Sequence, residues 1–180
     1  MNAEITDPGL FEFLDATHRE IYRQMLRLRA VVDAVELQGL NAANRVLAAQ
    51  VLEFFNREAR QHHLDEEKHI FPELLASDNP RIVQTAERLS QDHGWLEENW
   101  LQIAPSLSAA ANGNLWFDTA ELRHATEVFE ALYLEHILLE EAIAYPAARQ
   151  RLTAHDTRDM GREMARRRFA KARKPSHQTD

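Results

Sequence analysis

The chain has 180 residues, of which 44% are hydrophobic, and it carries a formal net charge of -8 at pH 7. This length suits one domain with a single core, and the negative charge argues against general binding to nucleic acids. The absence of cysteine excludes disulfides, thiolate ligands and cysteine nucleophiles, so a metal site would have to use histidine, aspartate and glutamate.

The N-terminal sequence MNAEITDPGL has neither a basic segment nor an apolar core, so we expect no signal peptide. No apolar run approaches the roughly 20 residues of a membrane span. With only 5 glycines and 6 prolines, the chain favours long helices over a turn-rich β fold. We therefore expect an all-α, cytoplasmic protein without a membrane partner, either a monomer or a weak homodimer.

Four long segments have apolar residues at helical spacing and are separated by turn signals. The first begins at Asp7-Pro8, where proline suits the first position of a helix. Turn residues at 39–41, 77–79 and 113 then separate segments expected at 7–36, 42–76, 79–103 (fraying after Pro105) and 118–148. The pattern predicts an up-down-up-down four-helix bundle over residues 1–152.

The C-terminal part, residues 153–180, is expected to form a short basic helix at 157–172 and a disordered end at 174–180. Residues 158–174 hold eight of the 21 basic residues, which raises the alternative of a nucleic-acid patch. We favour an amphipathic helix that caps the bundle, with Met160, Met164 and Phe169 facing inward. No nucleic-acid partner is therefore expected.

The most unusual stretch is QHHLDEEKHIFP at residues 61–72, with three histidines and three acidic residues. Each helical residue advances about 100°, so residues four apart stand about 40° apart on one face. His62 lies at the centre of the apolar stripe and Glu66 lies about 40° away, whereas His63 falls near 100° and Glu67 near 140°. We expect His62 and Glu66 to face the core, and His63, Asp65, Glu67 and His69 to lie at its rim or just outside the site.

The other three helices each place one histidine at the centre of an apolar stripe. These are His18 on the first, His93 on the third and His136 on the fourth. Glu140 stands about 40° from His136, and Glu97 stands about 40° from His93. His124 falls near 120° from His136 and is expected on the surface.

The spacing of the turns places these histidines at one height. In an antiparallel hairpin, two residues share a level when they are equidistant from the turn. The midpoint of 18 and 62 is 40, that of 66 and 93 is 79.5, and that of 93 and 136 is 114.5. All three midpoints fall at expected turns, so the four histidines converge in the bundle core.

A cluster of this kind favours metal over a structural core. Buried carboxylates without a cation each cost several kcal/mol, and a metal pair removes that cost while using the imidazole lone pairs. Nitrogen and oxygen donors suit Fe, Mn or Zn. The ferritin-type Glu-x-x-His pattern is absent from the core faces, and one carboxylate from each of two helices indicates two ions bridged by Glu66 and Glu140.

The motifs resemble those of the hemerythrin-like, HHE cation-binding family over roughly residues 8–150. The matching elements are LDATHREI, HHLDEEKHIFP, DHGWLEE and HILLEEAIAYP, and proline follows the histidine by ten residues in both His-x-x-x-Glu elements. The resemblance implies a non-haem di-iron centre with an oxo or hydroxo bridge, with zinc or manganese as substitutes. It implies the metal ligands His18, His62, Glu66, His93, His136 and Glu140.

The resemblance also implies a small diatomic ligand, O2 or NO, but one position departs from the oxygen carriers. They have a fifth histidine four residues after that of the third helix, where this chain has Glu97. We expect Glu97 near the metals, as a seventh ligand or as a partner of the ligands. The pattern is closer to bacterial members with four histidines and two glutamates, linked to nitrosative stress and iron–sulfur repair.

Two functions stay open at this point. One is a binding protein that senses, stores or scavenges O2 or NO. The other is a redox enzyme that reduces NO or peroxide or repairs iron–sulfur centres. A purely structural bundle with an incidental metal is the third and weakest alternative.

Overall fold

The computed structural model describes the backbone of residues 9–37 and 39–172, and the side chains as far as residue 168. The predicted helix start at Asp7-Pro8, the predicted disordered end at 174–180 and the predicted inward side of Phe169 lie outside the described part. Within that part the structure is all-helical and contains no strand.

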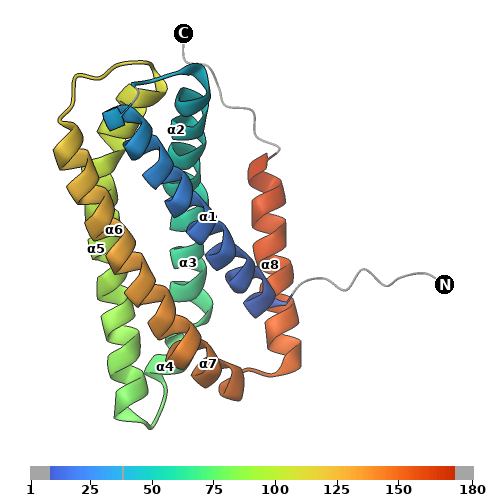
Figure 1. The fold of residues 1–180 in the computed structure, drawn as a ribbon. Helices are drawn as coiled ribbons and strands as arrows, with labels where there is room; N and C mark the ends of the chain where they lie inside the picture. Colours follow the sequence, from blue (N-terminus) through green and yellow to red (C-terminus); the bar gives the residue numbers. More distant parts are fainter. Residues whose placement is uncertain (1–8, 38, 173–180) are drawn as a thin grey trace.

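Four helical columns form the body of the molecule (Figure 1). The first column is the single helix α1 (Leu10–Leu37), and the third is the single helix α5 (Pro80–Ala111). The second column is α2 (Ala42–Phe54), the π-helix η1 (Phe55–Ala59), α3 (Arg60–His69) and α4 (Phe71–Leu75). The fourth is α6 (Thr119–Leu139), the π-helix η2 (Glu140–Ala144) and α7 (Tyr145–Arg151), and α8 (Ala154–Ala172) follows it.

The helix starts follow from capping residues in the sequence. The side chains of Asn41, Asn79 and Asp118 accept hydrogen bonds from backbone N–H groups in the first turns of α2, α5 and α6, which satisfies donors that a helix leaves free. Gly39 and Gly113 have φ values of 73° and 81°, a region in which a side chain would be strained. The predicted turns are therefore confirmed.

The structure differs from the predicted segments in three places. Helix α5 passes through Pro105 and ends at Ala111 instead of fraying, because Pro105 and Leu101 lie on the exposed face, where water can reach the unpaired carbonyl. Helix α8 begins at Ala154, three residues early. The two π-helices were not predicted at all.

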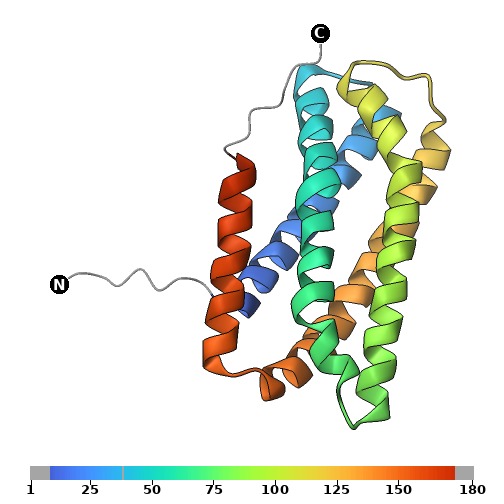
Figure 2. The same ribbon diagram turned by 180° about the vertical axis from the view of Figure 1, so that it is seen from behind.

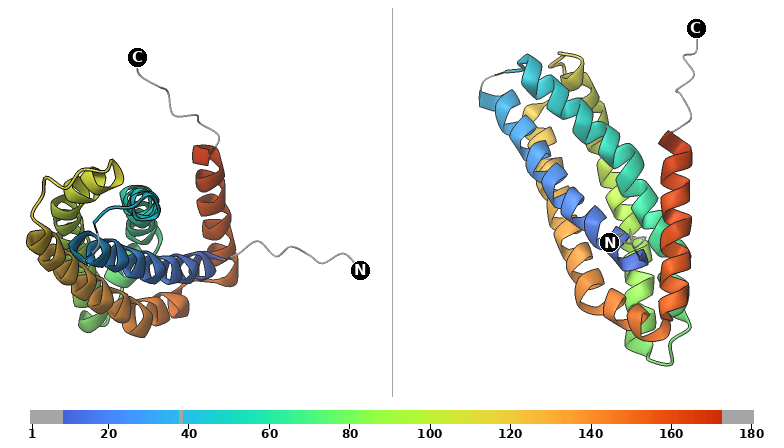
Figure 3. Two further views of the ribbon diagram at one scale, coloured as in Figure 1. Left: turned by 45° about the horizontal axis from the view of Figure 1, so that its top comes forward. Right: turned by 90° about the vertical axis from the view of Figure 1, so that its right-hand side faces the viewer.

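The helices pack in a closed ring, α1 against α2 and α6, and α5 against α2 and α6. The view from behind shows the α2–α3 column beside α5 (Figure 2), and the tilted view on the left of Figure 3 shows α8 outside the ring. None of the described helices is long and apolar enough to cross a membrane.

The core consists of two apolar clusters. One, here called the aromatic cluster, contains Phe55, Trp100, Phe129 and Tyr133 together with aliphatic residues such as Ile21. The other, the lower cluster, contains residues near the opposite end of the bundle, among them Leu14, Ile70, Leu89 and Ala144. Along the helices, His18, His62, His93 and His136 each fall between a residue of one cluster and a residue of the other.

Helix α8 packs against α1, and ion pairs connect it to α3 of the second column. Arg167 Nη1 lies 2.7 Å from Asp65 Oδ1, and Lys68 Nζ lies 2.8 Å from Glu163 Oε1. Met164 is buried in the lower cluster, as predicted. Arg167 of this helix therefore binds acidic groups of the same chain.

Candidate metal centre

A band of buried polar side chains separates the two apolar clusters. The four histidines at the centres of the helix stripes and the two glutamates four residues after His62 and His136 are 0% to 6% exposed. They come from α1, α3, α5, α6 and the first residue of η2. The structure thus brings together the six side chains that the sequence pointed to, which are His18, His62, Glu66, His93, His136 and Glu140.

These six residues form two groups that could each hold a metal ion. In each group every residue offers one nitrogen or oxygen atom, and these atoms lie within 4.8 Å of one another. The first group is His18, His62, Glu66 and Glu140. The second group is His93 and His136 with the same two glutamates. Both carboxylates therefore belong to both groups.

Outer carboxylates hydrogen-bond two of the imidazoles and approach a third. His18 Nδ1 lies 2.9 Å from Glu141 Oε1, and His93 Nδ1 lies 2.8 Å from Glu67 Oε1. His136 Nδ1 is 3.7 Å from Asp92 Oδ2, a looser approach. A carboxylate on one ring nitrogen commonly orients a metal-binding histidine, because it holds the proton there and leaves the other nitrogen free.

Several inner atoms of the cluster have no hydrogen-bond partner. These atoms include His93 Nε2, His136 Nε2, Glu66 Oε2 and both carboxylate oxygens of Glu140. His136 Nε2 and Glu140 Oε1 are only 3.0 Å apart, yet neither makes a hydrogen bond. Buried polar atoms are nearly always satisfied, so lone-pair donors that converge without partners fit a metal ion. The residues present match the donor set of such a site.

The protonation of the cluster is strongly perturbed in the protein without metal. Burial raises the pKa of Glu66 to about 7, and the nearby Glu140 carboxylate adds to this shift. Burial also acts to raise the pKa of Glu140, but His136 and His18 outweigh it and hold the pKa well below its usual range. Burial lowers the pKa of His136, but Glu140 and Asp92 outweigh it and raise the value to about 10. In the metal-free cluster, protons on Glu66 and His136 therefore balance the negative charge of the buried carboxylates.

Comparison with known proteins agrees with this geometry. The model of the hemerythrin HHE cation-binding domain matches residues 9–148. The chain belongs to this family. It is also similar to an uncharacterised protein of Haemophilus influenzae, with 31% identity over 160 residues that cover 89% of this chain and 90% of the relative.

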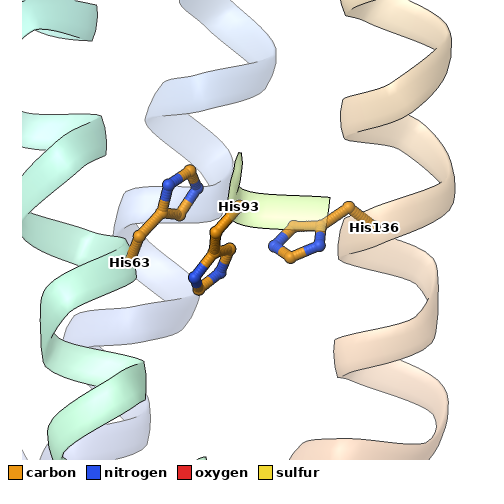
Figure 4. A group of neighbouring side chains, drawn as sticks. All are labelled: His63, His93 and His136. Atoms are coloured by element: carbon orange, nitrogen blue, oxygen red, sulfur yellow. The ribbon is translucent and has the colours of Figure 1, made fainter. Parts of the chain in front are cut away.

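This hemerythrin HHE domain places a further histidine beside the cluster. His63, expected at the rim, is partly exposed, but its ring is stacked on His93 with 4.0 Å between ring centroids. Its ring also meets that of His136 edge-on at 5.7 Å. His63, His93 and His136 form a third group that could hold a metal ion, and Figure 4 shows their side chains approaching one another.

Glu97 does not occupy the position expected of it. Its side chain is 50% exposed and its Oε1 lies 2.8 Å from Arg60 Nη2, so it belongs to none of the three groups. A long side chain near the edge of the stripe can reach water and a cation, which avoids the cost of burying its charge. The expectation of a core-facing Glu97 is therefore corrected.

The remaining histidine and acidic positions of the motif also have partners elsewhere. His69 Nε2 lies 3.1 Å from Glu163 of α8, and Asp65 is paired with Arg167. Glu67 is exposed and contacts His93, as expected of a residue just outside the site. His124 is exposed, as predicted.

The sequence interpretation missed Asp92 and Tyr145, two buried residues of the site in this family member. The Tyr145 hydroxyl donates a hydrogen bond to Glu66 Oε1 and lies 3.1 Å from His18 Nε2. On a regular helix Tyr145 would stand about 180° from His136. The π-helix η2 between them adds about one residue to the turn, which rotates Tyr145 by about 100° towards the core. No pattern in the sequence announces this insertion.

Proposed function

We propose that this protein binds two iron ions bridged by Glu66 and Glu140 and, through them, an uncharged diatomic molecule, O2 or NO. The observation that carries the proposal is the sharing of both carboxylates by two groups of potential ligands. A carboxylate has two oxygens and can contact two ions at once. Two sites with common carboxylates inside a four-helix, up-down-up-down bundle are typical of a dinuclear centre.

Under this proposal each residue has a defined role. His18 and His62 would hold one ion, His93 and His136 would hold the other, and each glutamate could contact both. The iron pair would supply the binding of a diatomic molecule. Glu141 and Glu67 hold protons on His18 Nδ1 and His93 Nδ1, so that Nε2 stays available.

The enclosure of the cluster favours a small ligand. The ligand-bearing side chains are almost fully buried, and the cavity beside His63 holds about 80 Å³, which suits a small molecule. A sensing, storage or scavenging role in the cytoplasm, as a monomer or weak homodimer, fits this site. Reduction of NO or peroxide, or repair of iron–sulfur centres, is the alternative that the test separates.

The test begins with metal analysis of protein purified without oxygen. We expect about two irons per chain and, in air, charge-transfer bands typical of a bridged ferric pair. A stable visible band on adding O2 or NO to the reduced protein supports binding. Rapid oxidation with turnover of NO or peroxide would favour the enzyme, and absence of iron after anaerobic purification would overturn the proposal.

Matched variants connect the metal to the named residues. Glu66→Ala and His136→Ala should each remove most of the iron. Glu97→Ala and His124→Ala change the same residue types at exposed positions and should leave the iron content within about 20% of the native value, since surface substitutions perturb little. Equal loss of iron from all four variants would contradict the ligand assignment.

A further inference from the structure

His63, His93 and His136 form a group of side chains without a carboxylate. Each offers one ring nitrogen, and the three nitrogens lie within 4.8 Å of one another. The residues belong to α3, α5 and α6, and Figure 4 shows their side chains reaching towards one another from separate helices. The two groups of the proposed iron pair each combine two imidazoles with two glutamates. The third group therefore differs from both in its donors.

Nitrogens of the two deeper imidazoles lack hydrogen-bond partners. His93 and His136 are 6% and 1% exposed. His93 Nε2 and both ring nitrogens of His136 are buried and have no hydrogen-bond partner among the described residues. The contact of His63 Nε2 with the Tyr133 hydroxyl is long, at 3.4 Å. Buried polar atoms are nearly always satisfied, so these rings have lone pairs to offer to a metal ion.

The choice of ion follows from the donors. His93 and His136 also belong to the second group, so an ion there excludes an ion in the third group. Carboxylates suit hard ions such as manganese, whereas imidazole suits zinc, copper and nickel as well as iron. A set of three histidines that leaves a fourth position open is one of the usual zinc sites. An ion that prefers nitrogen is therefore directed to the third group.

The π-helix η1 brings His63 into this group. On a regular helix His63 would stand about 80° from Phe55, a buried residue of the aromatic cluster, but one extra residue in the turn brings the two to within about 20°. His63 thus continues the stripe that faces α5 and α6. His62 faces α1 instead, with its ring 4.8 Å from that of His18. The two adjacent histidines therefore serve opposite sides of the cluster.

His63 is also the ring of this group that has room to turn. It lies flat against His93, with 4.0 Å between ring centroids and 13° between the ring planes. Parallel rings cannot both direct a lone pair at one ion, so binding requires one of them to turn. His93 is held by Glu67 Oε1, 2.8 Å from its Nδ1, and Phe71 covers its ring at 5.2 Å. His63 borders the cavity of about 80 Å³, into which its ring can move.

We propose that these three histidines form a second binding mode of the cluster, a three-imidazole site for a single zinc ion or a similar divalent cation that prefers nitrogen. His63 turns away from His93 and supplies the third nitrogen, and the fourth position stays open for water or a small ligand. The site uses neither Glu66 nor Glu140. It does not depend on the proposed iron pair, and zinc bound there keeps iron out of the position of His93 and His136.

The native protein tests this assignment without a substitution. The full-length chain is freed of metal by chelation and titrated with zinc, while nitrogen NMR follows the histidine rings. We expect the first equivalent of zinc to shift a ring nitrogen of His63, His93 and His136 and to leave His18 and His62 unshifted. A first equivalent that leaves His63 unchanged, or that shifts His18 and His62 equally, would overturn the proposal.

Substitutions at neighbouring positions separate a ligand from a packing residue. His63→Phe keeps an aromatic ring on His93 but removes the nitrogen, and it should weaken binding of the first zinc by about 100-fold, since one of three donors is lost. His62→Phe, one residue away, should instead remove iron and spare the first zinc. His124→Phe, at an exposed position, is the control for the substitution itself. Equal zinc affinity in His63→Phe and the native chain would show that His63 only packs against His93.

Competition between metals separates this proposal from the proposed function. Native chains loaded without oxygen from an equimolar mixture of ferrous iron and zinc should take up mainly zinc, and His63→Phe should raise the ratio of bound iron to zinc by about tenfold. An unchanged ratio would overturn the three-imidazole site and leave the iron pair intact. A protein that never binds two irons, but whose His63 binds the first zinc, would end the proposed function and leave this site standing.

Discussion

The two His-x-x-x-Glu elements have the same spacing but place their carboxylates in different surroundings. Glu140 lies between two imidazoles, 3.1 Å from His18 Nε2 and 3.0 Å from His136 Nε2. Glu66 lies 3.4 Å from His62 Nε2 and from His93 Nε2, and its closest partner is the Tyr145 hydroxyl. The pKa of Glu140 is held low, whereas burial raises the pKa of Glu66 to about 7.

The difference shows that one motif can supply two kinds of ligand. A buried pair of carboxylates cannot easily carry two full charges, so their pKa values separate. The one with cationic neighbours keeps its charge, and the other takes a proton and a neutral hydroxyl partner. Metal binding would have to displace the proton from Glu66, but not from Glu140.

The largest expected effect comes from replacing each glutamate by glutamine. Both Glu66→Gln and Glu140→Gln should lose most of the bound metal. In the metal-free protein the two variants should differ in unfolding free energy. Glu140→Gln leaves two imidazolium groups without their anion and should cost about 3–5 kcal/mol of unfolding free energy. Glu66→Gln mimics the protonated acid and should change it by less than about 1 kcal/mol.

Urea unfolding of the chelated proteins measures this divergence. Glu97→Gln, on the same kind of side chain but half exposed, is the control for the substitution itself. If Glu66→Gln destabilised the metal-free protein as much as Glu140→Gln, the two carboxylates would be equivalent and the comparison would fail.

A smaller effect is expected from the outer carboxylates. Glu141→Gln and Glu67→Gln remove the acceptors of His18 Nδ1 and His93 Nδ1. Such partners are typically worth about 10–100-fold in metal affinity. Competition with a chelator gives the affinity of each ion. Each variant should weaken mainly the ion on its own side, and an equal effect on both ions would show that the two groups do not act separately.

The pH dependence of the metal-free protein tests the protonation pattern as a whole. The pKa values of Glu66, His18 and His136 are raised to about 7, 8 and 10. Groups with raised values contribute stability that is complete below their unfolded pKa and is lost as pH rises through the folded one. The contribution of Glu66 is lost between pH 4.5 and 7, and those of His18 and His136 are lost above pH 6.5. The melting temperature of the chelated protein should therefore fall between pH 6.5 and 9, by several degrees.

The change of melting temperature with pH should have the opposite sign once metal is bound. Metal competes with these protons, so its affinity increases with pH. Above pH 6.5 the unfolded imidazoles are largely neutral, and the lowered pKa of buried His62 no longer matters there. A melting temperature of the chelated protein that is flat or rises over this range would contradict the assigned shifts.

The sequence predicted the parts of this arrangement that depend on local signals. Capping residues and turn glycines fixed the helix ends, and the 3.6-residue period placed each glutamate on the same face as the histidine four residues before it. His62 with Glu66, and His136 with Glu140, lie within about one turn of each other. No π-helix separates the members of either pair, so the helical wheel holds for them.

The positions that the sequence interpretation missed or placed wrongly depend on tertiary structure. His63 and Tyr145 are turned inward by π-helices, whose extra residue has no recognised sequence signature. Glu97 stands near the edge of the stripe, and its direction was decided by Arg60, a residue of another column. A helical wheel assigns an angle to each residue but takes no account of π-helix insertions or of side chains from neighbouring helices.

The smallest expected effect concerns Tyr145, the partner that distinguishes Glu66 from Glu140. Tyr145→Phe removes the hydroxyl and leaves the ring, which is stacked with His18 at 5.4 Å between centroids. The metal-free protein should lose about 1–2 kcal/mol of stability, since a buried acid is left without its neutral donor. Metal content should stay near normal, because Tyr145 belongs to neither ligand group.

Tyr133→Phe, in the aromatic cluster beside His63, is the matched control and should leave the pH dependence of metal uptake unchanged. Tyr145→Phe should shift the pH dependence of metal uptake, because loss of the hydroxyl changes the protonation of Glu66. Identical pH profiles for the two variants would show that Tyr145 does not affect the protonation of Glu66.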